Sequence, residues 1–137
     1  MSYGVAAALQ AAVYQRLLGD AGVSALVGAA VYDALPAGDL PQTYVSLGPE
    51  NVRDRSDRTG SGAVHQFTVS VVTQTAGFGA AKSVAAAVGD ALSGADLPLS
   101  RGRLVGLWFE RASARRSGKA GRTRRIDLRF RARVEDN

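Results

Sequence analysis

The chain of 137 residues contains no cysteine, one histidine and one tryptophan. The absence of cysteine excludes disulfides, a thiol nucleophile and thiolate metal sites, and it is typical of a reducing compartment. No apolar run approaches the roughly 18 residues of a membrane-spanning helix. The first residues also lack the charged start and apolar core of a signal peptide. We therefore expect a soluble, cytoplasmic chain with no membrane partner.

Residues suited to catalysis are scarce as well. His65 would need a nucleophile and an orienting carboxylate, and nothing in the sequence fixes Ser61 or Asp57 beside it. We interpret His65 as an edge histidine at the start of a strand. One histidine with scattered acids fits no zinc pattern. The glycine pair at 60–62 precedes a strand, and the pair at 77–79 lacks the completed phosphate-loop motif. The sequence predicts no enzyme, no metal site and no cofactor.

Charge is unevenly distributed along the chain. The formal net charge is +5, but residues 1–100 hold five basic and eight acidic residues, a net of −3. Residues 101–137 hold twelve basic and four acidic residues, a net of +8. This polarity favours an acidic partner, or association of a basic region of one copy with an acidic region of another. The alternative is a basic end that only increases solubility.

Apolar residues at helical spacing predict a helix over residues 4–18, with Ser2 as its N-cap and Gly19 as its stop. A short helix is expected over 21–27, and a second long helix over 79–92. Alternating apolar and polar residues predict the strands 43–47, 65–75, 104–115 and 126–134.

We expect Gly48 and Pro49 to end the first strand, and a long exposed loop to follow over 50–63. The expected fold is an α+β two-layer sandwich, in which a four-stranded, mainly antiparallel sheet packs against two helices in one domain, residues 1–137. The expected core comprises Leu9, Val13, Leu17, Val45, Phe67, Val69, Val71, Val84, Val88, Leu92 and Phe130.

The last strand carries a row of arginines. One face of residues 126–134 is apolar, and the other includes Arg129, Arg131 and Arg133. A glycine-containing basic stretch, residues 116–125, precedes it. Three interpretations of the basic hairpin, which this stretch forms with the strands on either side, remain open. It could be a two-stranded ribbon that binds DNA, or the wall of a ring through which DNA passes. It could also form ion pairs with carboxylates of a neighbouring subunit, such as Asp54 and Asp57.

Trp108 and Phe109 are adjacent in the preceding strand, so alternation places them on opposite faces. At most one of them can lie in the domain core. We expect the other to be covered by a neighbouring element or by another subunit, which is the first indication of oligomerisation.

The order and spacing of several segments resemble the small tail terminator or tail-completion proteins of long-tailed bacteriophages and of phage-derived gene transfer agents. The resemblance covers about residues 3–136, and no single motif carries it. The segments are VYDALPAGDLPQTYVSLG (31–48), HQFTVSVVTQTAGF (65–78), DALSGADLPL (90–99), LVGLWFERASARR (104–116) and TRRIDLRFRARVED (123–136).

The resemblance implies a structural virion protein in the tail of a phage-like particle that is assembled in the host cytoplasm. Such proteins form a ring, usually a hexamer, which ends the tail tube and meets the head-side connector, and DNA crosses the lumen. The expected partners are other copies of the chain, the major tail tube protein, the head–tail connector and, transiently, DNA. A head-completion or neck ring is an alternative, and a separate nucleic-acid-binding module is another.

The candidate interface residues fall into two groups. Those expected to contact another subunit or the tail tube are Arg53, Arg55, Arg58, Trp108, Phe109, Arg116, Lys119 and Arg122. Those expected to line a lumen or to form ion pairs between subunits are Arg129, Arg131 and Arg133.

Overall fold

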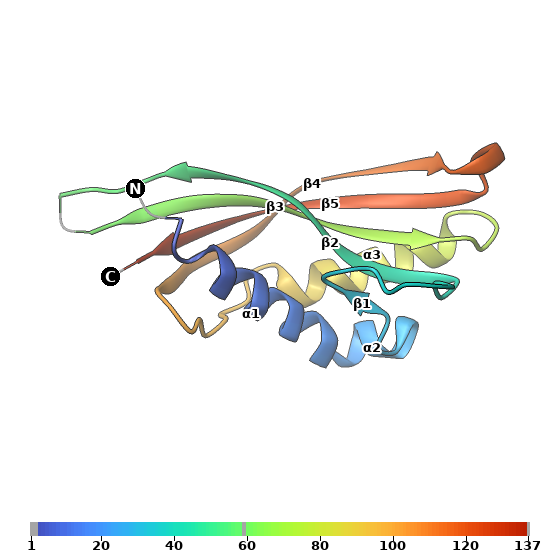
Figure 1. The fold of residues 1–137 in the computed structure, drawn as a ribbon, viewed down its shortest axis with the longest axis horizontal. Coiled ribbons are helices and arrows are strands. Elements are labelled where there is room, and N and C mark those ends of the chain that lie inside the picture. The colour runs from blue at the N-terminus through green and yellow to red at the C-terminus, as the bar shows by residue number, and fades with distance from the viewer. Residues whose placement is uncertain (1–2, 59, 137) are drawn as a thin grey trace.

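The computed structural model describes residues 3–58 and 60–136, which form three α-helices on one side of a five-stranded sheet (Figure 1). The helices are α1 (Ala6–Gly19), α2 (Ala21–Val27) and α3 (Gly79–Leu92). The strands are β1 (Val31–Tyr32), β2 (Thr43–Asp54), β3 (Gly62–Thr73), β4 (Arg103–Ser117) and β5 (Thr123–Glu135), with a 3-10 turn, η1 (Lys119–Gly121), between the last two.

The sheet has the strand order β1-β2-β3-β5-β4, and all its neighbours are antiparallel except the parallel pair β1 and β2. The expected α+β two-layer arrangement is therefore present. The expected count of four strands is wrong, because Val31 and Tyr32 add a fifth. A two-residue strand is too short to show alternation in the sequence, and it is held by contacts such as Val45 N–H to the carbonyl of Ala30 (2.9 Å).

Strand β2 continues past the point where the sequence predicted its end. The register with β3 shifts between Leu47 and Glu50, so Gly48 and Pro49 form an irregularity inside the strand. A bulge is one of the few places where a sheet accepts proline, which has no N–H to donate. The long loop expected over 50–63 is consequently wrong, and only residues 55–61 connect β2 to β3.

Helices were predicted more accurately than strands. The ranges 21–27 and 79–92 are confirmed, and α1 begins at Ala6, two residues later than expected. The N-cap expected at Ser2 lies outside the described residues. Helix α2 is capped by the carboxylate of Asp20, which accepts from Val23 N–H (3.0 Å), and it ends at Gly28 with φ of 60°. None of the described helices is long and apolar enough to cross a membrane.

The core lies between the helices and the inner face of the sheet. All eleven residues expected there are buried. Phe130, at the centre of β5, stacks on Phe67 of β3 with 5.6 Å between ring centroids, and both face the helices. None of the described helices lies over the opposite face of the sheet (Figure 1). We call it the open face.

Two hairpins project from opposite ends of the molecule (Figure 1). The β2–β3 hairpin turns through residues 55–61, and the β4–β5 hairpin turns through residues 118–122. The basic stretch predicted to connect the last two strands is therefore shorter than expected, since residues 116–117 and 123–125 belong to β4 and β5. The sheet is thus longer than the layer of helices that covers it.

Candidate assembly surfaces

Strand β4 forms one edge of the sheet and carries both aromatic candidates. Phe109 is paired in register with Phe130, and Trp108 with Arg131, so the two side chains lie on opposite faces, as the sequence predicted. Neither is in the core: Trp108 is 43% exposed and Phe109 is 47% exposed. Half-exposed aromatic side chains on an edge strand are typical of surfaces that another chain covers.

The open face carries arginines from three strands. Arg129, Arg131 and Arg133 of β5 face outward, and Arg111 of β4 is paired with Arg129. Arg53 of β2 and Arg133 are both paired with Val64 of β3, on either side of it. We call Arg53, Arg111, Arg129, Arg131 and Arg133 the arginine face.

The arginine face is only partly neutralised within the subunit. Arg129 donates from Nε to Glu110 Oε1 (3.0 Å), and Gln66 donates to the same carboxylate. These hydrogen bonds, that from Arg129 first, hold the pKa of Glu110 below its usual value. The guanidinium of Arg131 lies 5.1 Å from the centre of the Trp108 ring. Among residues 3–58 and 60–136, Arg53 and Arg133 have no carboxylate within ion-pair distance.

A second polar network fixes side chains beside the basic hairpin. Asp127 accepts hydrogen bonds from Ser70 Oγ (2.7 Å) and Arg125 Nε (2.9 Å), and Arg115 lies 3.5 Å away. Burial alone raises the pKa of Asp127, but these hydrogen bonds and the two arginine charges outweigh it, so its pKa lies below the usual value. Arg115 and Arg125 are thus engaged within the subunit.

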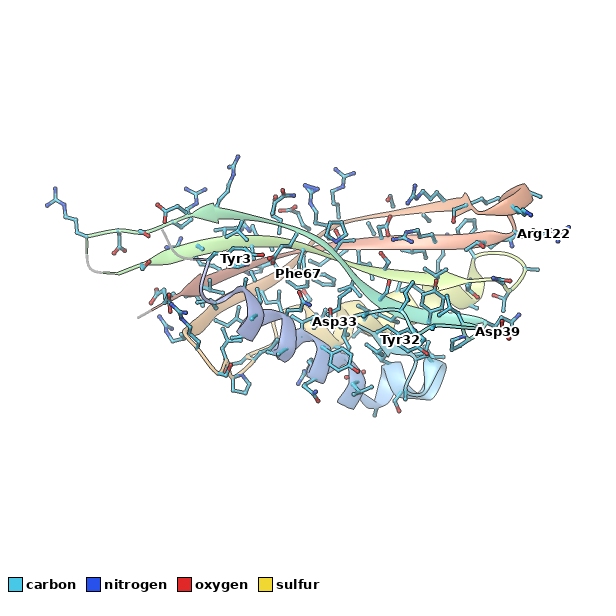
Figure 2. The ribbon with its side chains drawn as sticks, viewed as in Figure 1. Tyr3, Tyr32, Asp33, Asp39, Phe67 and Arg122 are labelled. Carbon is cyan, nitrogen blue, oxygen red and sulfur yellow. The ribbon has the colours of Figure 1, made fainter. Side chains whose placement is uncertain are left out.

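The remaining basic candidates lie at the two hairpin tips. Arg55 and Arg58 are exposed in the β2–β3 turn, whereas Lys119 and Arg122 are exposed in the β4–β5 turn, and Arg116 ends β4 beside the latter. Figure 2 labels Arg122 at one end of the molecule. The structure therefore separates these candidates into two groups rather than joining them in one site.

Asp54 and Asp57, which the sequence suggested as partners for the basic hairpin of a neighbouring subunit, accept hydrogen bonds within the β2–β3 turn. Asp54 accepts from the backbone N–H (3.2 Å) and hydroxyl (2.6 Å) of Ser56, and the hydroxyl contact is the main cause of its lowered pKa. Asp57 accepts from Gly60 N–H (2.9 Å). The β2–β3 turn lies at the end of the molecule opposite to the β4–β5 turn (Figure 1).

His65 is not an edge residue, so that interpretation is wrong. It is fully buried in the central strand β3, because β2 extends beside it and Val52 pairs with it. Its Nδ1 lies 3.3 Å from Glu50 Oε2, and the ring of Tyr3 stacks over it, with the Tyr3 hydroxyl donating to Glu50. Its Nε2 is buried without a hydrogen-bond partner among the described residues.

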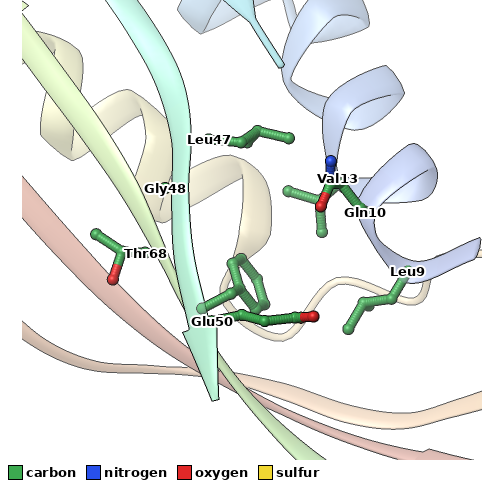
Figure 3. Close-up of a pocket in the computed structure, with 8 residues that line it drawn as sticks. Leu9, Gln10, Val13, Leu47, Gly48, Glu50 and Thr68 are labelled. Carbon is green, nitrogen blue, oxygen red and sulfur yellow. The ribbon is translucent and has the colours of Figure 1, made fainter. Parts of the chain in front are cut away.

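An open depression of about 670 Å³ lies beside this cluster, and Tyr3, Gln10 and Glu50 are among its lining residues. A second cavity near Glu50 is too small for a substrate. It has a volume of about 20 Å³ and lies between α1 and the bulge of β2, where Glu50 and Gly48 line it (Figure 3). A space of this size holds a single water molecule. Within the described ranges, no three His, Asp or Glu side chains gather as a metal site would require.

A larger groove runs along the β4 edge, on the side of the sheet that faces the helices. Its volume is about 500 Å³. Helix α3 forms one wall and β4 with β5 the other. The lining residues are Lys82, Ala85, Ala86, Gly89, Asp90, Ser93, Phe109, Ala112, Ser113, Ala114, Ile126 and Leu128. Small and apolar side chains dominate this surface, which we call the α3–β4 groove.

Sequence reasoning missed Arg111, Glu110 and this groove. Register shifts follow Leu104 and Phe109, and each adds one residue to β4, so a uniform alternation does not assign its faces. The sequence did contain one signal for an uncovered strand face. Ala112 and Ala114 alternate along the strand after Trp108 and Phe109, where a strand covered by a helix usually has larger apolar residues.

Known families and structures provide an independent comparison. A family described as tail completion protein gp17 matches residues 11–135 of the chain. A solved structure described as the virion of a native gene transfer agent (GTA) particle contains a chain that is 69% identical, with a TM-score of 0.93. The match covers 98% of this chain and 99% of that one. No curated protein sequence matches significantly.

Proposed function

Because the chain belongs to the tail completion protein gp17 family, we propose that its copies form a ring, a hexamer in the simplest case, that ends the tail tube of a gene transfer agent particle. In this proposal the chain is a structural protein rather than an enzyme, and residues 1–137 act as one domain. The relative of 69% identity, which comes from a gene transfer agent virion, supports the choice of particle.

The observation that carries the ring is the exposure of Trp108 and Phe109 on the edge strand β4. A lone subunit leaves 43% of Trp108 and 47% of Phe109 in water, whereas a neighbour that covers them removes this apolar area from water. The opposite edge, β1, has a different composition, so the contact joins two unlike surfaces. A contact of this kind repeats around a closed ring when its rotation returns to the start.

The positions of the two hairpin tips support one orientation of the subunit relative to the ring axis. They lie at opposite ends of the long axis (Figure 1), so a ring whose axis follows this direction presents one tip on each rim. We assign the tip with Arg116, Lys119 and Arg122 to the tail tube protein, and the tip with Arg55 and Arg58 to the head-side connector. Ion pairs at such wet rims contribute only about 0–1 kcal/mol each and act mainly on register.

The arginine face is assigned to the lumen. If neighbouring sheets meet edge to edge and the helices lie outside, the open face points to the ring axis, where DNA passes. Arg53 and Arg133, which have no carboxylate within ion-pair distance among the described residues, then contact phosphates without reading sequence. Arg131, whose guanidinium lies over the Trp108 ring, extends this row. Arg129, which is paired with Glu110, serves to position this row.

The proposal is tested by measuring the mass of the purified chain at micromolar concentration, alone and with tail tube protein. A closed oligomer that binds tube ends supports it. A particle that stays monomeric in both conditions contradicts it, and a closed ring that binds only head-side proteins favours a head-completion or neck ring.

A second candidate, a separate nucleic-acid-binding module, is favoured by the same unpaired arginines. It predicts duplex binding by the monomer, with an affinity that falls as salt rises. Binding by the monomer that is as tight as binding by the oligomer would favour this candidate. Absence of duplex binding by the monomer at low salt removes it.

A further inference from the structure

One segment on the opposite side of the sheet has the properties expected of an occupant for the α3–β4 groove. Residues 33–41, which follow β1, are exposed throughout and form no helix or strand. Two leucines are among them, Leu35 at 53% and Leu40 at 38% exposure. Ala34, Pro36, Ala37 and Pro41 are exposed beside them, so the segment presents a contiguous apolar surface of the kind that a partner covers. We call residues 33–41 the acidic knob, since Asp33 precedes Leu35 and Asp39 precedes Leu40.

The charges of the knob and of the groove are complementary. The carboxylate of Asp39 has no hydrogen-bond or ion-pair partner among the described residues, and that of Asp33 accepts only from the amide of Gln10 (2.6 Å). The groove carries Lys82 at its edge. Arg116 lies beyond its floor, at the next position on the β4 face that carries Ala112 and Ala114.

The groove also offers an apolar floor of suitable character. Ala112 and Ala114 are exposed although they are paired with the buried Leu128 and Ile126, because α3 leaves this part of the sheet uncovered. Phe109 closes the floor at one end and contacts Phe130 edge to face at 5.9 Å. Small side chains leave room for inserted leucines. Asp90 lines the groove too, so the aspartates of the knob belong at the Lys82 end.

The knob cannot reach the groove of its own subunit, because the two lie at opposite edges of the sheet. The knob directly follows β1, which is the edge strand on one side, and the groove runs along β4, the edge strand on the other. Asp39 and Arg122 nevertheless lie at the same end of the long axis (Figure 2). Rotation about an axis along that direction brings the knob of one copy to the groove of the next without a shift along the axis.

We propose that the acidic knob of each subunit inserts into the α3–β4 groove of its neighbour, with Leu35 and Leu40 on the apolar floor and Asp39 near Lys82 and Arg116. The partner is a second copy of this chain, and the contact is head to tail. The inference rests on the proposed ring and specifies which surfaces close it. A contact without axial shift gives a closed ring rather than a filament.

A complementation experiment tests the head-to-tail contact. The knob variant is Leu35→Asp with Leu40→Asp, and the groove variant is Ala112→Glu; all three positions are exposed, so both variants should fold with the wild-type circular dichroism spectrum. Each variant alone is expected to lose the ring and to have a dissociation constant raised more than tenfold. An equimolar mixture should form heterodimers and nothing larger, since only one working knob and one working groove remain.

A charge exchange tests the register of the contact. Asp39→Lys and Lys82→Asp should each weaken the ring about fivefold, and their combination should restore it. Asp96→Lys changes another exposed acid, in the α3–β4 connection, and is the matched control that should leave the ring unchanged.

The outcomes separate this inference from the proposed function. If the wild-type chain forms rings and the knob variant forms them equally well, the knob-in-groove contact is wrong but the proposed ring is not. Wild-type chains that remain monomeric even with tail tube protein overturn the ring and the contact with it. A mixture of the variants that restores full rings, or that shows no association, contradicts the head-to-tail arrangement.

Discussion

Phe109→Ala is expected to weaken the ring while leaving the subunit folded. A phenylalanine side chain offers about 200 Å² of surface, and Phe109 is 47% exposed, so roughly 90 Å² remains for a neighbour to cover. At about 25 cal/mol per Å², the loss is about 2 kcal/mol for each interface, or about thirtyfold in its dissociation constant. The buried half of the Phe109 side chain packs on Phe130 and contributes a similar free energy, about 2 kcal/mol, to folding. This is small beside a typical unfolding free energy of about 5–15 kcal/mol, so the variant should fold.

The assay is sedimentation velocity over a concentration series, combined with thermal unfolding at a concentration where every chain is monomeric. Val105→Ala is the matched control, because Val105 lies in the same strand with 43% exposure but does not line the groove. The control should retain the wild-type dissociation constant. Equal dissociation constants for the two variants would refute the reasoning, as would a Phe109→Ala chain that no longer folds.

The remaining predictions concern fluorescence, acid and salt. Trp108 is the single tryptophan and is 43% exposed, so its emission should shift to the blue when rings form; identical spectra for diluted and assembled chains would show that it stays uncovered. Because the folded-state pKa of Asp127 is lowered, its stabilisation is present above the ordinary pKa of about 4 and is lost as pH falls through the lowered value. Asp127→Asn should therefore reduce the acid dependence of the monomer's unfolding free energy relative to the wild-type chain, and an unaltered pH profile would contradict this. Arg131→Ala with Arg133→Ala should lower the slope of log affinity for duplex DNA against log salt by about two per contacting subunit, whereas Arg101→Ala, whose guanidinium is held by Asp136, should leave it unchanged.

The helices and the central strands could be predicted from the sequence because their signals are local. Helix α3 has an uninterrupted apolar stripe between the glycines at 79 and 94, and its bounds were predicted without error. Strand β5 alternates without a bulge, so the burial of Ile126, Leu128 and Phe130 followed directly.

The errors arose where distant segments decide the local structure. Gly48 and Pro49 resemble a strand end, but pairing with β3 continues the strand through a bulge. His65 resembled an exposed strand start for the same reason, since the extension of β2 buries it. The pairing of Val31 and Tyr32 with β2 also depends on a tertiary contact that no periodicity encodes.

The assembly surfaces were predicted in part. Alternation predicted that at least one of Trp108 and Phe109 lies outside the core. Both are half exposed, because α3 leaves the part of β4 that contains Phe109 uncovered. Where a helix packs along a strand depends on tertiary contacts. The row at Arg129, Arg131 and Arg133 was correctly placed on a face away from the core. Its extension by Arg53 and Arg111, and the neutralisation of Arg129 by Glu110, required the register of neighbouring strands.

The most direct test of the central claim is a reconstruction of the intact particle at a resolution that identifies this chain. The account predicts a closed ring at the head-proximal end of the tail tube, with the tip containing Lys119 and Arg122 toward the tube and residues 33–41 of each subunit against the next subunit's β4. Density for the chain as isolated copies, or as a ring elsewhere on the particle, would contradict it.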